Sequence, residues 1–336
     1  MESELLLGVV AFALTLYGLT GGADFGGGVW EFNTALSASD KERALIYRAI
    51  GPVWEANHVW IIFALVGLFT GFPVAFAGIC RALWIPLLLA LAGIVFRGVG
   101  FVFRSYAVDD PHAQAAWGAV FALASTAAPF FLGAAAGALA SGQLPLDAAG
   151  QYTGNAITGW LNPTSIYCGF FGVGVCAYLA SVYLVREAAW LEDAGLVELW
   201  RTRALATGAW MGILAVAGLA VTATDSPVLW AGLKARGLPL ILASVVFGNV
   251  SLFALWRRRH NLAVVGAIGA VTTVIWGCAL AMYPCVVPPN LTIAATAAPA
   301  NVMRAVLWSV GGGMVLLVPS LVLLFTLFKG KKPSVH

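Results

Sequence analysis

The sequence predicts an all-helical membrane protein with nine transmembrane helices. Hydrophobic residues make up 61% of the 336-residue chain and charged residues only 10%, whereas soluble domains average about 45–50% and about 25%. The apolar residues gather into segments of roughly 20 residues, the length that a helix needs to cross the hydrocarbon core. Residues 1–336 are therefore expected to form a single polytopic membrane domain. The predicted spans cover residues 5–24, 50–71, 81–102, 115–140, 163–185, 204–223, 238–256, 262–283 and 305–328.

The basic residues indicate how these spans are oriented. With the N-terminus outside the cell, all but four of the 18 Lys and Arg residues fall on the cytoplasmic side. The positive-inside rule therefore predicts an external N-terminus and a cytoplasmic C-terminus. The four external residues are Arg81, Lys234, Arg236 and Arg304. No soluble region carries a basic patch, so we expect no nucleic-acid partner.

The first span carries small residues at a regular spacing. Gly18, Gly22 and Gly26 recur every four residues and therefore share one face of a helix. Small residues at that spacing let two helix backbones approach closely in a membrane. We expect a packing seam that leaves Asp24 beside a neighbouring helix. A phosphate-binding glycine loop is excluded because no strand precedes these residues.

Two acidic residues stand among these apolar helices. Of the 15 Asp and Glu residues, only Asp24 and Glu55 fall within or at the edge of a predicted span. A charged group at the bilayer centre costs about 2.5–3.5 kcal/mol, so such groups usually face a bundle interior or a water-filled cavity and often handle protons. Asn57 and His58 follow Glu55 closely, and we predict a proton route formed by these four residues. The alternative is a structural carboxyl group hydrogen-bonded to Asn57, His58 or Arg97.

Other residues near this cluster have expected roles of their own. Trp54 and Trp60 flank it and are candidates for an oxygen route or its gating, with simple packing as the alternative. Arg97 and Arg104 lie near the inner end of the third span and are expected to be structural charge partners. The fourth to ninth spans carry no charge in mid-span, so they are expected to be scaffold or interface.

The connection over residues 29–49 holds the charged run Asp40–Arg43. Such a run is typical of a short amphipathic helix on the cytoplasmic surface with solvated charges.

The sequence does not predict a metal or haem site. The five cysteines show no CxxC spacing and are expected to be buried, inert thiols. His58 could ligate a haem, but the other three histidines fall in connections or in the tail. We therefore expect this chain to ligate no cofactor, and a free-standing membrane cytochrome is disfavoured.

A proton-coupled secondary transporter that uses Glu55 is a further alternative. Transporters usually show broken helices in two corresponding halves. Here the polar residues crowd the first three spans only, which disfavours a transporter.

Several motifs resemble subunit II of the cytochrome bd-type quinol oxidases, at consistent spacings over nearly the whole chain. The form with Glu55 and His58 resembles the cyanide-insensitive branch of that family. The motifs are residues 21–28 (GGADFGGG), 50–60 (IGPVWEANHVW), 72–73 (FP), 96–104 (FRGVGFVFR), 283–284 (YP) and 290–292 (NLT).

The resemblance implies two four-helix bundles plus one peripheral helix, in the bacterial cytoplasmic (inner) membrane. It implies a heterodimer with a subunit I that holds haems b558, b595 and d and the quinol site, together with a small single-helix accessory subunit, lipid and quinone. The complex would oxidise ubiquinol or menaquinol, reduce oxygen to water and generate proton motive force without pumping. This chain would not be catalytic alone, but would support assembly, haem retention, and proton and oxygen access.

The resemblance also assigns roles to single residues. Asp24 and Glu55 match family carboxylates on a proton route from the cytoplasm, and Trp60 matches a tryptophan at the mouth of an oxygen route. Val102 departs from the pattern, because some members have Asp at this position. If that Asp belongs to a proton path, this protein must do without it.

Overall fold

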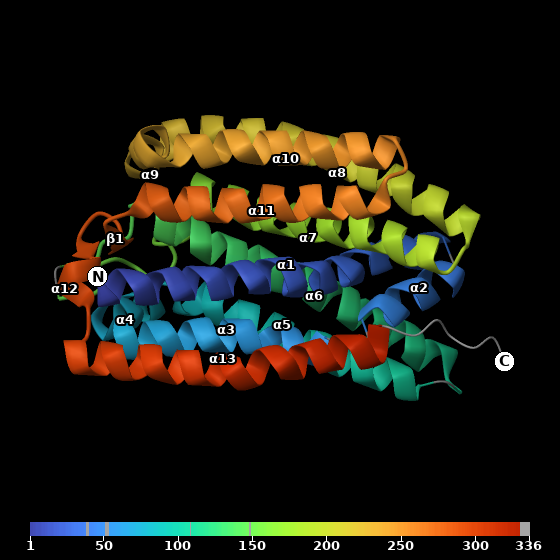
Figure 1. The fold of residues 1–336 in the computed structure, drawn as a ribbon, viewed down its shortest axis with the longest axis horizontal. Helices are drawn as coiled ribbons and strands as arrows, with labels where there is room; N and C mark the ends of the chain where they lie inside the picture. The colour runs from blue at the N-terminus through green and yellow to red at the C-terminus, as the bar shows by residue number, and fades with distance from the viewer. Residues whose placement is uncertain (38–39, 51–53, 108, 148, 330–336) are drawn as a thin grey trace.

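The computed structural model describes residues 1–37, 40–50, 54–107, 109–147 and 149–329. Within these ranges the chain is almost entirely helical, and its long helices run alongside one another (Figure 1). The elements in chain order are α1 (Glu2–Ser37), α2 (Asp40–Ile50), α3 (Trp54–Gly71), α4 (Pro73–Ala82), α5 (Trp84–Tyr106), α6 (Pro111–Ser141), α7 (Pro163–Trp190), α8 (Ala194–Asp225), α9 (Pro227–Gly232), the π-helix η1 (Leu233–Gly237), α10 (Leu238–Trp256), α11 (His260–Met282), β1 (Cys285–Val287), β2 (Leu291–Thr292), α12 (Ile293–Thr296) and α13 (Ala300–Lys329).

The prediction of an all-helical membrane chain is confirmed. Eight of the described helices are long and apolar enough to cross a membrane, and the bent pair α2 and α3 would supply a ninth span. Each predicted span contains a helix, and the span predicted over residues 238–256 coincides with α10. The largest difference is in α1, which continues to Ser37 and so runs well past residue 24, where the predicted span ends.

Polar side chains and prolines define where several long helices begin. The side chains of Asp110, Asn162 and Asp193 accept hydrogen bonds from the first free backbone N–H groups of α6, α7 and α8. Pro111 and Pro163 follow the first two of these caps, at a position whose N–H has no partner within the helix. These local signals set the residue at which each of these helices begins.

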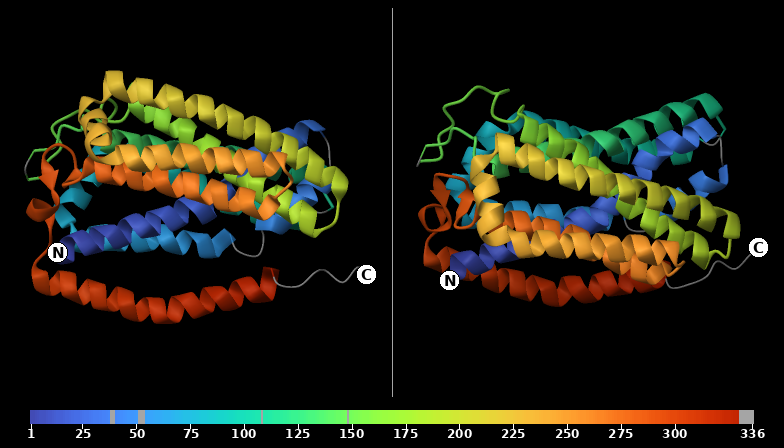
Figure 2. Two further views of the ribbon diagram at one scale, coloured as in Figure 1. Left: turned by 45° about the horizontal axis from the view of Figure 1, so that its top comes forward. Right: turned by 90° about the horizontal axis from the view of Figure 1, so that it is seen from above.

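The helices fall into a closed group of four and a more open set. α7, α8, α10 and α11 pack against one another in a ring. α1 lies beside this ring and contacts α3, α6, α7 and α11, while α5 packs along α6. α13 lies along α3 and α1 at the edge of the molecule, with most of its surface exposed (Figure 2). The extensive contacts of α3 are with α1, α4 and α13.

The two ends of the molecule differ in structure. The N-terminus, the β1–β2 hairpin, α9 and α12 lie at one end, and α2 lies at the other (Figure 1). At the first end, Asn290 Nδ2 donates to Leu146 O at 2.8 Å, which ties the hairpin to the connection after α6. Arg81 Nη1 donates to Gln151 Oε1 at 2.7 Å and fastens the same connection to α4.

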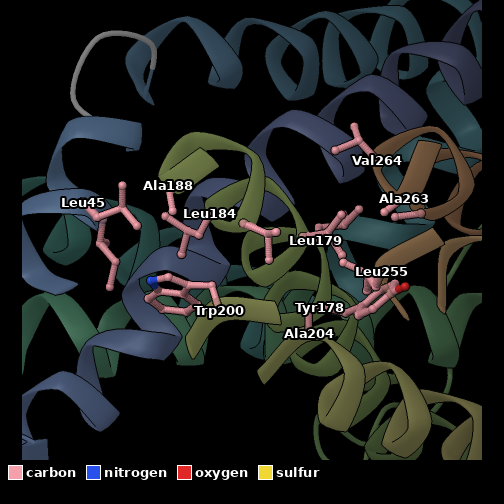
Figure 3. Close-up of a cluster of buried hydrophobic side chains, with 14 of the residues drawn as sticks. Leu45, Tyr178, Leu179, Leu184, Ala188, Trp200, Ala204, Leu255, Ala263 and Val264 are labelled. Atoms are coloured by element: carbon pink, nitrogen blue, oxygen red, sulfur yellow. The ribbon is translucent and has the colours of Figure 1, made fainter. Parts of the chain in front are cut away.

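The largest cluster of buried side chains lies between α2 and the four-helix ring. Figure 3 shows Leu45, Trp200 and Leu179 within it, and Trp200 and Leu179 are fully buried. Tyr178 brings a hydroxyl group into this region. It donates to Ser251 Oγ at 2.7 Å, and Ser251 donates to Ala263 O at 2.7 Å. The buried hydroxyls are thus satisfied across α7, α10 and α11.

Candidate functional site

A buried polar cluster joins α1, α3 and α5. Asp24 on α1, Asn57 on α3 and Arg97 on α5 are 5%, 4% and 1% exposed. Three such groups rarely share the interior of an apolar helix assembly, because each loses water on burial. Within the cluster, Asn57 donates a hydrogen bond to Asp24, and the charge of Arg97 opposes that of Asp24.

Asn57 and Asp24 are directly connected. Asn57 Nδ2 donates a hydrogen bond to Asp24 Oδ2 and also lies 3.5 Å from Thr20 O. Thr20 and Asp24 are four residues apart and thus one turn apart on the same side of α1. The side-chain amide of Asn57 therefore contacts two successive turns of α1, on the side of α1 that faces α3. The structure brings together two of the residues predicted to form the proton route.

Arg97 supplies the positive charge of the cluster. It is within electrostatic range of Asp24, Tyr17 and Cys176. Its guanidinium carbon lies 5.0 Å from the centre of the Phe25 ring and 5.7 Å from that of Phe121. A fully buried arginine is tolerated only with an opposing charge and polar or aromatic partners. Asp24 and Arg97 therefore stabilise each other.

His58 stands at the edge of the same cluster. Its Nδ1 lies 3.4 Å from the hydroxyl oxygen of Tyr17, and the side chain is half-buried. The His58 ring also meets Phe25 edge-on, with 6.1 Å between ring centres. Tyr17 and His58 thus form a second polar pair between α1 and α3, next to the Asp24–Asn57 pair.

Glu55 does not join these groups. It lies in the first turn of α3 with its side chain exposed on the surface of this chain. We predicted a buried carboxyl group; the structure instead starts α3 at Trp54, so Glu55 stands at the helix end. The side chain of Trp54 lies outside the described residues.

The glycines predicted as a packing seam lie at helix contacts. A Cβ at Gly18 would lie 3.3 Å from Ile275 of α11, and one at Gly22 would lie 3.4 Å from Leu179 of α7. Gly26 is the closest approach, because a Cβ there would overlap the carbonyl oxygen of Cys176. The seam therefore fixes α1 against α7 directly beside Asp24.

A second buried acidic residue lies toward the α2 end of the molecule. Glu31 is 3% exposed, and its Oε1 accepts from Arg104 Nη1 at 2.5 Å and lies 3.7 Å from Arg43 Nε. Arg104 is therefore a structural charge partner, as expected, and its partner is Glu31. Sequence reasoning missed Glu31 because the predicted span ended at residue 24. The available signal was its spacing, since Glu31 lies seven residues, or about two turns, after Asp24.

α2 is held by buried ion pairs rather than by solvation alone. Arg203 Nη1 on α8 lies 2.6 Å from Glu42 Oε2, and Glu42 is only 6% exposed. Arg48 Nε lies 3.3 Å from Glu187 Oε1 on α7. The prediction of a helix here is correct, but the prediction that its charges are solvated is wrong for Glu42. Paired charges let the helix bury one face against α7 and α8.

Replacing Glu31 by Gln is expected to destabilise the protein. The change leaves Arg104 and Arg43 without their shared carboxylate, and breaking a buried pair costs about 3 kcal/mol. The thermal midpoint of the purified complex measures this. Glu198→Gln is the control, because Glu198 pairs with Arg201 at the surface and should leave the midpoint unchanged. Equal midpoints for Glu31→Gln and the wild type would contradict the assignment.

Trp60, which packs in the same buried cluster as Tyr17 and Phe25, also borders an apolar cavity. The side chain is 7% exposed, and the cavity has a volume of about 420 Å³ between α1, α3 and α13. Besides Trp60, its walls come from Phe12, Leu16, Met314, Leu321, Val318, Val322 and Thr326. The Trp60 side chain thus lies near the polar cluster and also forms part of the wall of an apolar space beside α13.

Within the described ranges, no three His, Cys, Asp or Glu side chains gather as a metal site would require. The polar groups that the site offers are the buried acid Asp24, the amide of Asn57, the guanidinium of Arg97 and the Tyr17–His58 pair.

Comparison with known proteins identifies the family. A family model described as cytochrome bd terminal oxidase subunit II matches residues 2–328. The chain belongs to this family. The sequence resemblance is thus confirmed, and the family match speaks against the alternative of a proton-coupled transporter.

Individual relatives agree with the assignment to subunit II. The chain is 27% identical over 325 residues to cytochrome bd-I ubiquinol oxidase subunit 2 of Escherichia coli, covering 85% of this chain and 81% of that protein. It is 34% identical over 127 residues to cytochrome bd ubiquinol oxidase subunit 2 of Bacillus subtilis, covering 38% and 36%. The bd oxidase structure from Geobacillus thermodenitrificans shares the fold, with a TM-score of 0.82 at 21% identity over 98% of this chain and 99% of that chain.

As a subunit II, the chain is part of an oxidoreductase complex and is a multi-pass protein of the cytoplasmic membrane. Membership of the family also implies a partner subunit I.

Proposed function

We propose that this subunit II gives protons and oxygen access to a catalytic centre carried by subunit I and helps that subunit retain its haems. The complex would oxidise ubiquinol or menaquinol, reduce oxygen to water and build a proton motive force without pumping. Haems b558, b595 and d would all be held by subunit I, and a small single-helix subunit would complete the assembly. The observation that carries the proposal is the buried Asp24–Asn57–Arg97 cluster.

The cluster suits proton transfer because Asp24 is buried away from water but still has a hydrogen-bond partner and an opposing charge. Asp24 accepts a hydrogen bond from a neutral amide and faces the fixed charge of Arg97. A proton on Asp24 would leave its hydrogen-bond partner Asn57 in place, and the then unbalanced charge of Arg97 would favour release of that proton. In this proposal Glu55 receives protons at the surface, and Asp24 holds them inside with Asn57 as its hydrogen-bond partner. Tyr17 and His58 line the same face.

The orientation proposed for the chain places the end of the molecule that holds α2 on the cytoplasmic side. The end formed by α2 and the neighbouring helix termini holds Arg43, Arg48, Arg104 and Arg203. This concentration fits the cytoplasmic side under the positive-inside rule. Protons would then enter from the cytoplasm, with α2 and α3 together serving as one of nine spans.

The cavity beside Trp60 supports oxygen access. Oxygen is apolar and concentrates in lipid, and the cavity is apolar and opens next to the peripheral helix α13. We propose that oxygen enters through this cavity and passes Trp60, which gates it.

Filling the cavity is expected to slow oxygen entry. Met314 lines it, and Met314→Trp places a larger side chain in the same space, so kcat/KM for oxygen should fall severalfold while turnover at saturating oxygen stays unchanged. The control is Val315→Trp on the next, exposed position of α13, which should behave as the wild type. Oxygen consumption at varied oxygen concentration measures both. Equal kcat/KM values for the two variants would contradict the proposed route.

The assignment as a haem-retaining, non-haem subunit is tested by purifying the tagged chain from membranes and recording its reduced-minus-oxidised spectrum. Haem bands that accompany a second polypeptide support the proposal. Haem bound to this chain alone would overturn it, and so would the absence of both haem and partner.

A further inference from the structure

The end of the molecule that holds the N-terminus contains a second cavity. Its volume is about 220 Å³, and it lies between α9, α11 and the turn that follows α11. Val228, Leu229, Met282 and Pro289 give it a mostly apolar wall, and Arg236 supplies its one cationic side chain. None of the described residues that line it is acidic.

The π-helix η1 explains why Arg236 faces this cavity. Gly232 and Gly237 both lie against the backbone of α11, and a Cβ on Gly237 would lie 2.8 Å from Gly277 O. Five residues turn an α-helix through about 500°, which would point these two positions well away from each other. The wider i→i+5 turn brings them to the same side. η1 is thereby pressed onto α11 along both glycines, which sets Arg236 over the end of α11.

A single contact fixes the guanidinium of Arg236. Its Nη2 donates to Ala281 O at 3.0 Å, in the last turn of α11, where backbone carbonyls lack helical partners. Arginine has five N–H donors, and the Arg236 side chain lines the cavity while remaining exposed, so further N–H groups are available to a ligand. Arg236 and Cys285 both line the cavity, and the charge of Arg236 opposes the rise in pKa that burial gives the Cys285 thiol.

The charges around the cavity leave Arg236 without an acidic partner in the described part of the chain. At the same end, Arg304 lies 3.6 Å from Glu2, and Arg81 is bonded to Gln151. Glu4, at the same end, accepts a hydrogen bond from Tyr283 at 3.0 Å. Among the described residues Arg236 forms no ion pair, although a cation on the outer side, where the proposed orientation places it, runs against the positive-inside rule.

We propose that this cavity binds an anionic phospholipid, with its phosphate on Arg236 and the upper part of one acyl chain against the apolar wall. The planar guanidinium matches two phosphate oxygens at once. The apolar wall selects a lipid over a soluble anion, because an inorganic ion would leave that surface empty. Val228 in this wall has an exposed side chain, as an apolar residue that meets a lipid would.

The lipid bound by the purified complex tests the site. The complex is washed exhaustively in detergent, and phosphatidylglycerol and cardiolipin per complex are counted by mass spectrometry. Arg236→Gln should lose one tightly held anionic phospholipid relative to the wild type. Arg304→Gln removes another arginine at the same end, one that does not line the cavity, and should retain it. Equal lipid content in Arg236→Gln and the wild type overturns the proposal.

A second measurement covers the case in which Arg236→Gln does not assemble. The delipidated wild-type complex is mixed with phosphatidylglycerol, phosphatidylcholine or inorganic phosphate, and its thermal midpoint is recorded. Phosphatidylglycerol alone should raise the midpoint. An equal rise with phosphatidylcholine, or a rise with inorganic phosphate alone, overturns the proposal. These results are independent of the proton and oxygen routes.

Discussion

Asp24→Asn is expected to reduce oxygen-coupled quinol oxidation by roughly two orders of magnitude, the lower end of the usual contribution of a positioned proton-transfer group. The substitution keeps the shape of the side chain, and its oxygen can still accept from Asn57 Nδ2. It removes only the capacity to carry a proton and the charge that faces Arg97. Turnover is measured per assembled complex, with haem content taken from the visible spectrum.

The loss of charge must be separated from the loss of the proton. Asp24→Asn leaves Arg97, 1% exposed, opposite a neutral group, and an unbalanced buried charge is itself destabilising. The double variant Asp24→Asn with Arg97→Gln restores neutrality without restoring an acid. If Asp24 carries protons, the double variant stays slow. Recovery of wild-type turnover would show that Asp24 acts only as the counter-ion of Arg97.

Gly26→Ala is expected to prevent assembly of the complex. A Cβ at this position would overlap the backbone carbonyl of Cys176 and the Cβ of Ala180, and backbone cannot move aside as a flexible side chain can. α1 would have to separate from α7, which costs at least the 1–3 kcal/mol typical of overpacking. The same shift would move Asp24, two residues earlier. The measurement is the amount of haem-containing complex in membranes.

Gly22→Ala is the matched control for this prediction. It lies one turn earlier on the same face, and its added Cβ would lie 3.4 Å from Leu179 and 3.6 Å from the Cys176 sulfur, which are ordinary contacts. We expect this variant to assemble at nearly the wild-type level. If Gly26→Ala accumulated equally well, the contact between α1 and α7 would be looser than described.

Hydrophobic patterning predicted the helices well, because spans of about 20 apolar residues have few alternatives in a membrane. It failed at the end of α1. The predicted span ended at residue 24, two residues before Gly26 and four before Gly28. In the structure these residues permit close contact with Cys176 and Ser125 instead, so α1 continues and buries Glu31.

The candidate site was predictable in part. Asp24 and Asn57 were identified from polarity in an apolar helix, and the structure joins them. The exposure of Glu55 was not predictable, because it depends on where α3 begins, which hydrophobicity alone does not specify to within a turn. The partners of Arg104 and of Glu42 depended on contacts between helices far apart in sequence, which one sequence without tertiary geometry does not specify.

The most direct test of the central claim is the rate at which the membrane-reconstituted complex takes up protons while it reacts with oxygen. The reduced complex is mixed with oxygen in sealed vesicles, and the voltage change from proton uptake is followed in time for the wild type and Asp24→Asn. The account predicts that this phase slows at least tenfold in the variant, with oxygen binding unchanged. An unaltered voltage phase in a fully assembled Asp24→Asn complex would contradict it.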